Sequence, residues 1–162
     1  MSLSKIGIIP ARLHSTRFPK KILVDIDGKP MVIRTAERAV KAKSLDRVII
    51  AIDSDETYQA LKGFDYEIIM TSKEHKSGTD RIAEVAQNIS NVDIIVNIQA
   101  DEPFINPSLI DRLVDAHTDP NIKMSTLVST KLSAEDCENE SVVKAFIDRD
   151  NFAVDFKRRS SA

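Results

Sequence analysis

The chain has 162 residues, which is the length of one domain at roughly 150 residues per domain. Apolar residues make up 42% of the chain and charged residues 30%, a balance that favours one packed core over a disordered chain. The formal net charge of −2 and the pI of about 5.9 argue against a general nucleic-acid-binding protein, which would be basic.

The apolar residues follow two alternating periods. Short continuous runs are typical of buried strands, and the segments between them carry apolar residues at helical spacing. In chain order, we predict a strand over 6–9, a helix over 31–40, a strand over 47–52, a short helix over 55–61, a strand over 66–70, a helix over 79–89, a strand over 93–98 and a helix over 107–116. Residues 125–130 and 142–147 are further strand candidates, and a turn at 148–151 leads into 152–156.

Strands that alternate with helices predict an α/β fold with a mostly parallel central sheet. Their continuous apolar composition fits a sheet that is covered on both faces. Such sheets bind ligands beyond the carboxyl ends of their strands, so we expect function in the loops that follow the strands. These loops are 11–21, 53–55, 71–78 and 99–103.

The loop after the first predicted strand is rich in cations. Arginine offers a planar fork of donors and lysine a compact charge, a mixture that suits a polyphosphate. The glycine spacing of a Walker loop or a GxGxxG fingerprint is absent, so NAD binding is not expected. The alternative is a solvated basic loop, but the position at a strand exit favours a functional role. The cations are Arg12, Arg17, Lys20 and Lys21, and the hydroxyls are Ser15 and Thr16.

Residues 9–23 read Ile-Pro-Ala-Arg-x-x-Ser-Thr-Arg-x-Pro-x-Lys-x-Leu, which resembles the opening motif of the sugar-acid cytidylyltransferases. The resemblance is greatest to the branch that acts on 3-deoxy-manno-octulosonate (Kdo), and it continues through 24–31. The sialic-acid branch carries a Gly-Ser-Lys and Lys-Asn version of this loop, which does not match. The resemblance implies a Rossmann-like nucleotidyltransferase fold of the nucleotide-diphospho-sugar transferase type.

The second loop contains His-x-Ser-Gly-Thr-Asp-Arg at 75–81. Gly78 permits a close approach of the backbone to a ligand, and Ser77 or Thr79 can cap the following helix. Backbone donors at such a helix start suit an anionic or carbonyl-rich ligand. The alternative is a capped helix with an incidental histidine at His75. The block resembles the second motif of the same family, which implies a part in the cytosine and ribose pocket.

The third loop reads Gln-Ala-Asp-Glu-Pro at 99–103 and resembles the family's Gln-Gly-Asp-Glu-Pro motif. A carboxylate just past a strand end is well placed to hold Mg²⁺, and Asp101 is our candidate ligand. Two adjacent acids before a proline also fit an ordinary turn. Ala100 replaces the glycine of the motif, and its methyl group matters if the backbone there has positive φ or closely approaches the nucleotide.

Residues 53–55 read Asp-Ser-Asp, which mimics the DxD metal motif of nucleotide-sugar enzymes. Capping of the following helix by Ser54 or Asp55 is the simpler interpretation.

The resemblance implies transfer of CMP from CTP to Kdo with release of pyrophosphate, for lipopolysaccharide biosynthesis. The implied catalytic residues are Arg12, Arg17, Lys21 and Asp101, with Asp101 as the Mg²⁺ ligand. The implied sugar contacts are Gln99 and Arg158. The implied nucleotide-binding residues are Pro10, Ala11, Arg12, Ser15, Lys21, Thr71, Ser72, Ser77, Gly78, Arg81, Gln99 and Asp101.

The resemblance extends over about 6–156, and we take 1–156 as an incomplete nucleotide-binding domain with a basic tail at 157–162. Family members are longer, and the part beyond is expected to supply most of the sugar pocket, a second metal-binding aspartate and the dimer contact. We therefore expect CTP·Mg²⁺ binding with weak or no turnover, a compromised homodimer and exposed apolar surface. The alternatives are another sugar-acid or polysaccharide-type cytidylyltransferase, or an inactive nucleotide-binding remnant.

No apolar run approaches the roughly 18 residues that a membrane helix needs. The first residues lack the pattern of a secretory signal peptide, and the single cysteine, Cys137, excludes an internal disulfide and a thiol-rich metal site. We therefore expect a cytoplasmic protein with no nucleic-acid or membrane partner.

Overall fold

The computed structural model describes residues 3–13 and 19–158 of the chain. It divides into two compact units, Met1–Ser125 and Thr126–Ala162. The predicted arrangement of one domain over 1–156 and a tail over 157–162 stays a prediction.

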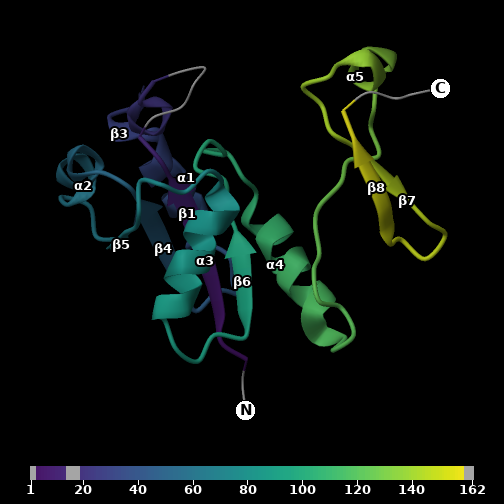
Figure 1. The fold of residues 1–162 in the computed structure, drawn as a ribbon, viewed down its shortest axis with the longest axis horizontal. Coiled ribbons are helices and arrows are strands. Elements are labelled where there is room, and N and C mark those ends of the chain that lie inside the picture. The colour runs from purple at the N-terminus through teal and green to yellow at the C-terminus, as the bar shows by residue number, and fades with distance from the viewer. Residues whose placement is uncertain (1–2, 14–18, 159–162) are drawn as a thin grey trace. The chain divides into compact units, whose positions relative to one another are not determined.

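The first unit is built on a four-stranded sheet in the order β5-β4-β1-β6 (Figure 1). Every neighbouring pair is parallel, with Ile8 of β1 opposite Ile49 of β4 and Asn97 of β6. This confirms the predicted α/β fold with a parallel sheet. The strands are β1 (Lys5–Ala11), β4 (Arg47–Ile52), β5 (Glu67–Met70) and β6 (Ile94–Asn97).

Four helices connect or follow these strands, as the apolar spacing predicts. They are α1 (Met31–Ala39), α2 (Asp55–Leu61), α3 (Gly78–Asn88) and α4 (Pro107–Asp115), and a 3₁₀ turn, η2 (Ala116–Thr118), extends α4. The helix ends follow local chemistry, because Ser54, Ser77 and Asn106 each cap the helix that they precede.

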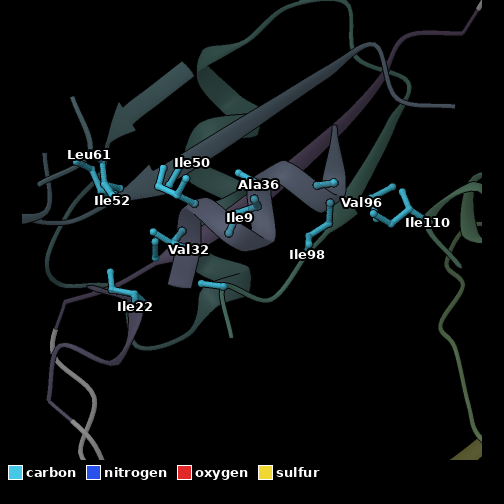
Figure 2. Packing of buried hydrophobic residues seen from close by; sticks show 14 of the residues in the cluster. Ile9, Ile22, Val32, Ala36, Ile50, Ile52, Leu61, Val96, Ile98 and Ile110 are labelled. Carbon is cyan, nitrogen blue, oxygen red and sulfur yellow. The ribbon is translucent and has the colours of Figure 1, made fainter. Parts of the chain in front are cut away.

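The sheet is buried on both faces, which explains why its strands are apolar without alternation. On one face Ile9, Ile50 and Ile52 pack with Val32 and Ala36 of α1 (Figure 2). On the other face the core is formed by Ile6, Ile8, Ile49 and Ala51 of the sheet with Ile82 and Val85 of α3. The sheet therefore lies between α1 and α3, and its carboxyl edge is left to the loops.

A short hairpin follows the first loop and leads into α1. It comprises the 3₁₀ turn η1 (Lys21–Leu23), β2 (Asp25–Ile26) and β3 (Lys29–Pro30). Its two turn residues, Asp27 and Gly28, both have positive φ, which suits a two-residue hairpin. The sequence analysis did not predict this hairpin, because its strands are too short to show a period.

The second unit contains α5 (Ala134–Glu138) and an antiparallel hairpin of β7 (Lys144–Ile147) and β8 (Ala153–Lys157). The hairpin and its turn confirm the predicted strand at 142–147 and the turn into 152–156. The prediction of a strand over 125–130 is wrong, because those residues pair with no strand among the described residues. The β-branched residues of 125–130 favour an extended chain, but a strand also needs a neighbouring strand to pair with.

Among the described residues, no helix combines the length and the apolar character needed to cross a membrane.

Candidate nucleotide site

A cavity of about 190 Å³ opens at the carboxyl edge of the sheet. Its lining comes from the end of β1, the residues that precede and begin α3, and the residues that follow β6. Six of the seven lining residues are among the predicted nucleotide-binding residues, and Lys76 is the addition. The lining is Pro10, Arg12, Lys76, Ser77, Gly78, Arg81 and Gln99.

The start of α3 forms one wall of this cavity. The Ser77 hydroxyl accepts a hydrogen bond from the Asp80 amide at 3.1 Å, and the Asp80 carboxylate accepts one from the Ser77 amide at 3.1 Å. This reciprocal box confirms the predicted cap at Ser77. Hydrogen bonding from the Ser77 hydroxyl lowers the pKa of the Asp80 carboxyl.

Gly78 packs directly against the end of β1. A Cβ atom at Gly78 would lie 3.1 Å from Cγ of Pro10, which is tighter than ordinary contacts. The absent side chain therefore lets the start of α3 approach β1, and this approach places Ser77 and Pro10 in one cavity wall.

Glu84 of α3 holds the loop that precedes the helix through two contacts. Its carboxylate accepts a hydrogen bond from the Ser72 amide at 2.9 Å and pairs with Nε2 of His75. The Ser72 amide and, after it, His75 lower the pKa of the Glu84 carboxyl. Nothing in the sequence points to Glu84, and an incidental His75 is one of the two interpretations that the sequence leaves open. The glutamate at i+9 from a histidine is no local motif, so only the fold reveals the pair.

Arg81 is buried, with a residue exposure of 1%. Its guanidinium donates to the Thr71 hydroxyl, to the Ser72 carbonyl at 3.1 Å and to the Asp53 carboxylate at 3.1 Å. The Thr71 hydroxyl in turn donates to the Ile52 carbonyl at 2.7 Å. Arg81 and Thr71 are both predicted to bind nucleotide. In the structure, the guanidinium of Arg81 and the hydroxyl of Thr71 join the ends of β4 and β5 by hydrogen bonds.

The Asp-Ser-Asp segment at the end of β4 does not gather metal ligands. The Ser54 hydroxyl accepts a hydrogen bond from the Thr57 amide at 3.2 Å, which confirms its role as the cap of α2. The Asp53 carboxylate pairs with Arg81 and accepts a hydrogen bond from the Leu13 amide at 2.9 Å. Over the described parts of the chain, no three His, Cys, Asp or Glu side chains are arranged to hold a metal ion.

Lys21 and Asp101, predicted for phosphate and for Mg²⁺, lie in contact. The Lys21 ammonium is 2.7 Å from the Asp101 carboxylate, and both side chains are somewhat under half exposed. A pair this exposed contributes at most about 1 kcal/mol to stability, so a charged ligand can separate the two groups at small cost. Asp101 lies two residues beyond Gln99 of the cavity wall.

Gln99 and Ala100 have opposite environments. Gln99 is exposed, and its amide nitrogen donates to the side-chain oxygen of Asn97 at 2.7 Å. Ala100 is buried in the core, and its carbonyl accepts a hydrogen bond from the Thr35 hydroxyl at 2.9 Å. The backbone at Ala100 does not have positive φ, so the methyl group that departs from the motif brings no backbone strain.

The remaining predicted residues lie elsewhere. Ala11 is buried on β1. Ser15 and Arg17 lie outside the described residues. Arg158 belongs to the second unit, where its guanidinium donates to the Glu140 carbonyl at 3.2 Å. The assignment of all these residues to CTP or Kdo stays a prediction.

Comparison with known proteins shows the family to which the chain belongs. The family described as Cytidylyltransferase matches residues 6–161. This chain belongs to the cytidylyltransferase family.

Two relatives of this cytidylyltransferase chain carry the same name. It is 45% identical over 153 residues to the 3-deoxy-manno-octulosonate cytidylyltransferase of Geobacter sulfurreducens, and 46% identical over 156 residues to that of Syntrophobacter fumaroxidans. Each alignment covers 94% of this chain, but 61% and 62% of the respective relative. The chain thus spans about 61% of the length of the curated relatives that it matches.

One solved structure is similar over nearly the whole chain. The structure of a CMP:2-keto-3-deoxy-manno-octonic acid synthetase complexed with CTP is similar, with a TM-score of 0.88 and 36% identity. The similarity covers 96% of this chain and 64% of that one. The cytidylyltransferase chain therefore has the nucleotidyltransferase fold that its opening motif implies.

Proposed function

We propose that this chain is the nucleotide-binding part of a CMP-Kdo synthetase, which transfers CMP from CTP to Kdo and releases pyrophosphate. The observation that carries the proposal is the cavity at the carboxyl edge of the sheet, whose lining takes Arg12, Ser77 and Gln99 from the three motif blocks. The Kdo-type relatives and the similar structure with CTP support the choice of nucleotide and sugar.

In this proposal the cations of the site hold the triphosphate. Arg12 lines the cavity, and Lys21 lies on η1 with its ammonium free to exchange Asp101 for a phosphate oxygen. Arg17 and Ser15 complete the set by resemblance. The positive charge stabilises pyrophosphate as it leaves, which is the kind of electrostatic catalysis that phosphoryl chemistry needs.

The donor set fits a magnesium ion that is shared with the nucleotide. Asp101 offers one accessible carboxylate, and Mg²⁺ takes one or two protein carboxylates and completes its shell with phosphates and water. When bound there, the ion would neutralise phosphate charge and polarise the attacking hydroxyl. We propose Asp101 as its ligand from this chain.

The proposed reaction conserves atoms and charge in one displacement. A sugar hydroxyl oxygen bonds to the α-phosphorus, the bond from that phosphorus to the bridging oxygen breaks, and the hydroxyl proton leaves to solvent. Pyrophosphate departs with the bridging oxygen. Because no covalent intermediate is required, the residues of this chain act by positioning and by charge, with Gln99 proposed between nucleotide and sugar.

Arg158 is proposed as a further sugar contact.

Since CTP and Kdo are both charged and water-soluble, we place the reaction in the cytoplasm, as a step toward lipopolysaccharide. Another sugar-acid or polysaccharide-type cytidylyltransferase is not favoured, because the matched relatives carry the Kdo name.

The proposal is tested by titrating the polypeptide of residues 1–162 with CTP in the presence of Mg²⁺, with ATP as the control nucleotide. We expect CTP to bind at one site and ATP to bind at least tenfold more weakly. Pyrophosphate release is then measured with Kdo and with a second acidic sugar, and we expect release to be weak and to be greater with Kdo. Equal binding of the two nucleotides, or a preference for the second sugar, would contradict the proposal.

A further inference from the structure

The loop that carries Arg12 is anchored at its base by two hydrogen bonds on one residue. The Leu13 amide donates to the Asp53 carboxylate at 2.9 Å, and the Leu13 carbonyl accepts from the Lys20 amide at 3.1 Å. Leu13 is buried, with an exposure of 3%. Both peptide units of Leu13 are therefore fixed in orientation.

The first of these peptide units begins at Arg12. Because a peptide unit is planar, the bond from Leu13 to Asp53 fixes the direction of the Arg12 carbonyl as well. The backbone that carries the Arg12 side chain is thus held by Asp53, although Asp53 does not line the cavity. Arg12 itself is exposed there and free to meet a ligand.

The Asp53 carboxylate is itself held rigidly. Its second oxygen pairs with Arg81 at 3.1 Å, and the side-chain exposures of the two residues are 12% and 2%. Arg81 also donates to Thr71 and Ser72 in the loop after β5. One buried ion pair therefore connects the exits of β1, β4 and β5, which are three of the strand ends around the site.

We propose that Asp53 is a positioning residue of the nucleotide site, which fixes the Arg12 backbone for contact with the CTP phosphates through the Leu13 amide. The identity of the ligand rests on the proposed function, while the anchoring of Leu13 does not. A buried carboxylate needs partners to offset its desolvation, and here it satisfies a guanidinium and a loop amide together.

The test uses Asp53→Asn in residues 1–162, alone and together with Arg12→Ala. Asparagine keeps the size of the side chain, but when its oxygen accepts from Arg81, its NH2 group faces the Leu13 amide and cannot accept that hydrogen bond. If Asp53 acts through Arg12, Asp53→Asn weakens CTP binding about tenfold in the parent and less than twofold in the Arg12→Ala background. Equal weakening in both backgrounds would overturn the proposal and leave Asp53 a purely structural residue.

Thr57→Val is the matched control for loss of stability, since Thr57 is a buried polar residue of α2 whose hydroxyl hydrogen-bonds with the Ser54 hydroxyl. It should lower the melting temperature without changing the affinity for CTP. If Asp53→Asn fails to fold, Asp53→Glu takes its place, because it keeps the charge that pairs with Arg81 but moves the oxygen that accepts from the Leu13 amide.

Amide hydrogen exchange at Leu13 provides a readout that needs no ligand. We expect slow exchange in the parent and at least tenfold faster exchange in Asp53→Asn, with no change in Thr57→Val. If the parent chain binds no CTP, the proposed function fails, and Leu13 exchange alone judges the anchoring. Unchanged exchange at Leu13 in the Asp53 variant would overturn the inference even if CTP binds.

Discussion

At the scale of single residues, Lys76 shows how exposure and position together suggest a role. It is exposed, lines the cavity with Arg12, and lies one residue before the cap of α3. Its charge adds to the cations that we propose to face the phosphates of CTP.

We predict that Lys76→Ala weakens CTP binding by about fivefold, which corresponds to roughly 1 kcal/mol for a partly solvated charge contact. The matched control is Lys73→Ala, since Lys73 is an exposed lysine of the same loop that does not line the cavity. Calorimetric titration of the two variants distinguishes a local contact from a general loss of charge. Equal losses in both variants would contradict a specific role for Lys76.

The pair of Glu84 with Ser72 and His75 makes a prediction about pH. Because these contacts lower the pKa of Glu84 below its ordinary value of 4.5, its stabilising contribution is complete above that value and is lost as the pH falls through the lowered pKa. We expect melting temperatures of the parent to fall more steeply below about pH 4.5 than those of Glu84→Gln.

Asp111→Asn is the control for this experiment, since Asp111 also has a lowered pKa, through Ser44, but lies far along the chain from the loop. Asp111→Asn should also make the fall in melting temperature below about pH 4.5 less steep. It should leave the hydrogen exchange of the Ser72 amide unchanged, because that amide donates to Glu84. Identical pH curves for the parent and Glu84→Gln would show that the Glu84 contacts carry no stability.

Residue chemistry predicted part of the site. Arg12, Ser77 and Gln99 belong to motif blocks whose types and spacing are visible in the sequence, and the fold brings them to one cavity. Arg81 was assigned to the nucleotide by resemblance alone. Its role in joining strand ends depends on Asp53, 28 positions away, which no local pattern shows.

At the scale of elements, the start of α3 connects local sequence to the site. Its cap, Ser77, both satisfies the first turn of the helix and lines the cavity. Helix α5 begins with the same reciprocal box, formed by Ser133 and Asp136. The chain therefore contains a capping box inside the site and another in a different unit.

We predict that Ser77→Ala destabilises the chain by about 1 kcal/mol, as loss of a helix cap does, and also weakens CTP binding. Ser133→Ala removes the equivalent cap of α5 and should leave CTP binding unchanged. Chemical denaturation and CTP titration of both variants check this prediction. Weakened CTP binding in Ser133→Ala would show that the effect on affinity is not local.

Long elements were predictable, and short or isolated ones were not. The four strands of the central sheet are continuous apolar runs and helices α1 to α4 carry apolar residues at helical spacing, and packing on both faces of the sheet reinforces both patterns. The β2–β3 hairpin is set by Asp27 and Gly28 at positive φ, which periodicity does not detect. Residues 125–130 have strand-like composition but no strand partner among the described residues.

At the scale of the whole molecule, the two units differ in how well they bury apolar side chains. The first unit has a core on both faces of its sheet. In the second unit the large apolar side chains of the hairpin are exposed, with Phe152 at 56%, Val154 at 67% and Phe156 at 54%. Such a patch is typical of a surface that other protein covers.

We predict that the polypeptide of residues 1–162 associates as its concentration rises. Val154→Thr with Phe156→Ser should reduce this association, because it removes apolar surface from β8. Sedimentation velocity over a range of concentrations measures the association. The control is Tyr58→Ser, which replaces an exposed aromatic side chain on α2. A parent that stays monomeric at every concentration would contradict the prediction.

The most direct test of the whole account is the dependence of CTP binding on Mg²⁺ in the parent chain and in Asp101→Asn. We predict that Mg²⁺ tightens CTP binding in the parent at least tenfold, and that this gain falls to less than twofold in Asp101→Asn. CTP should still bind the variant without the metal, because Arg12 and Lys76 remain. A parent that binds no CTP, or an unchanged gain from Mg²⁺ in Asp101→Asn, would contradict the account.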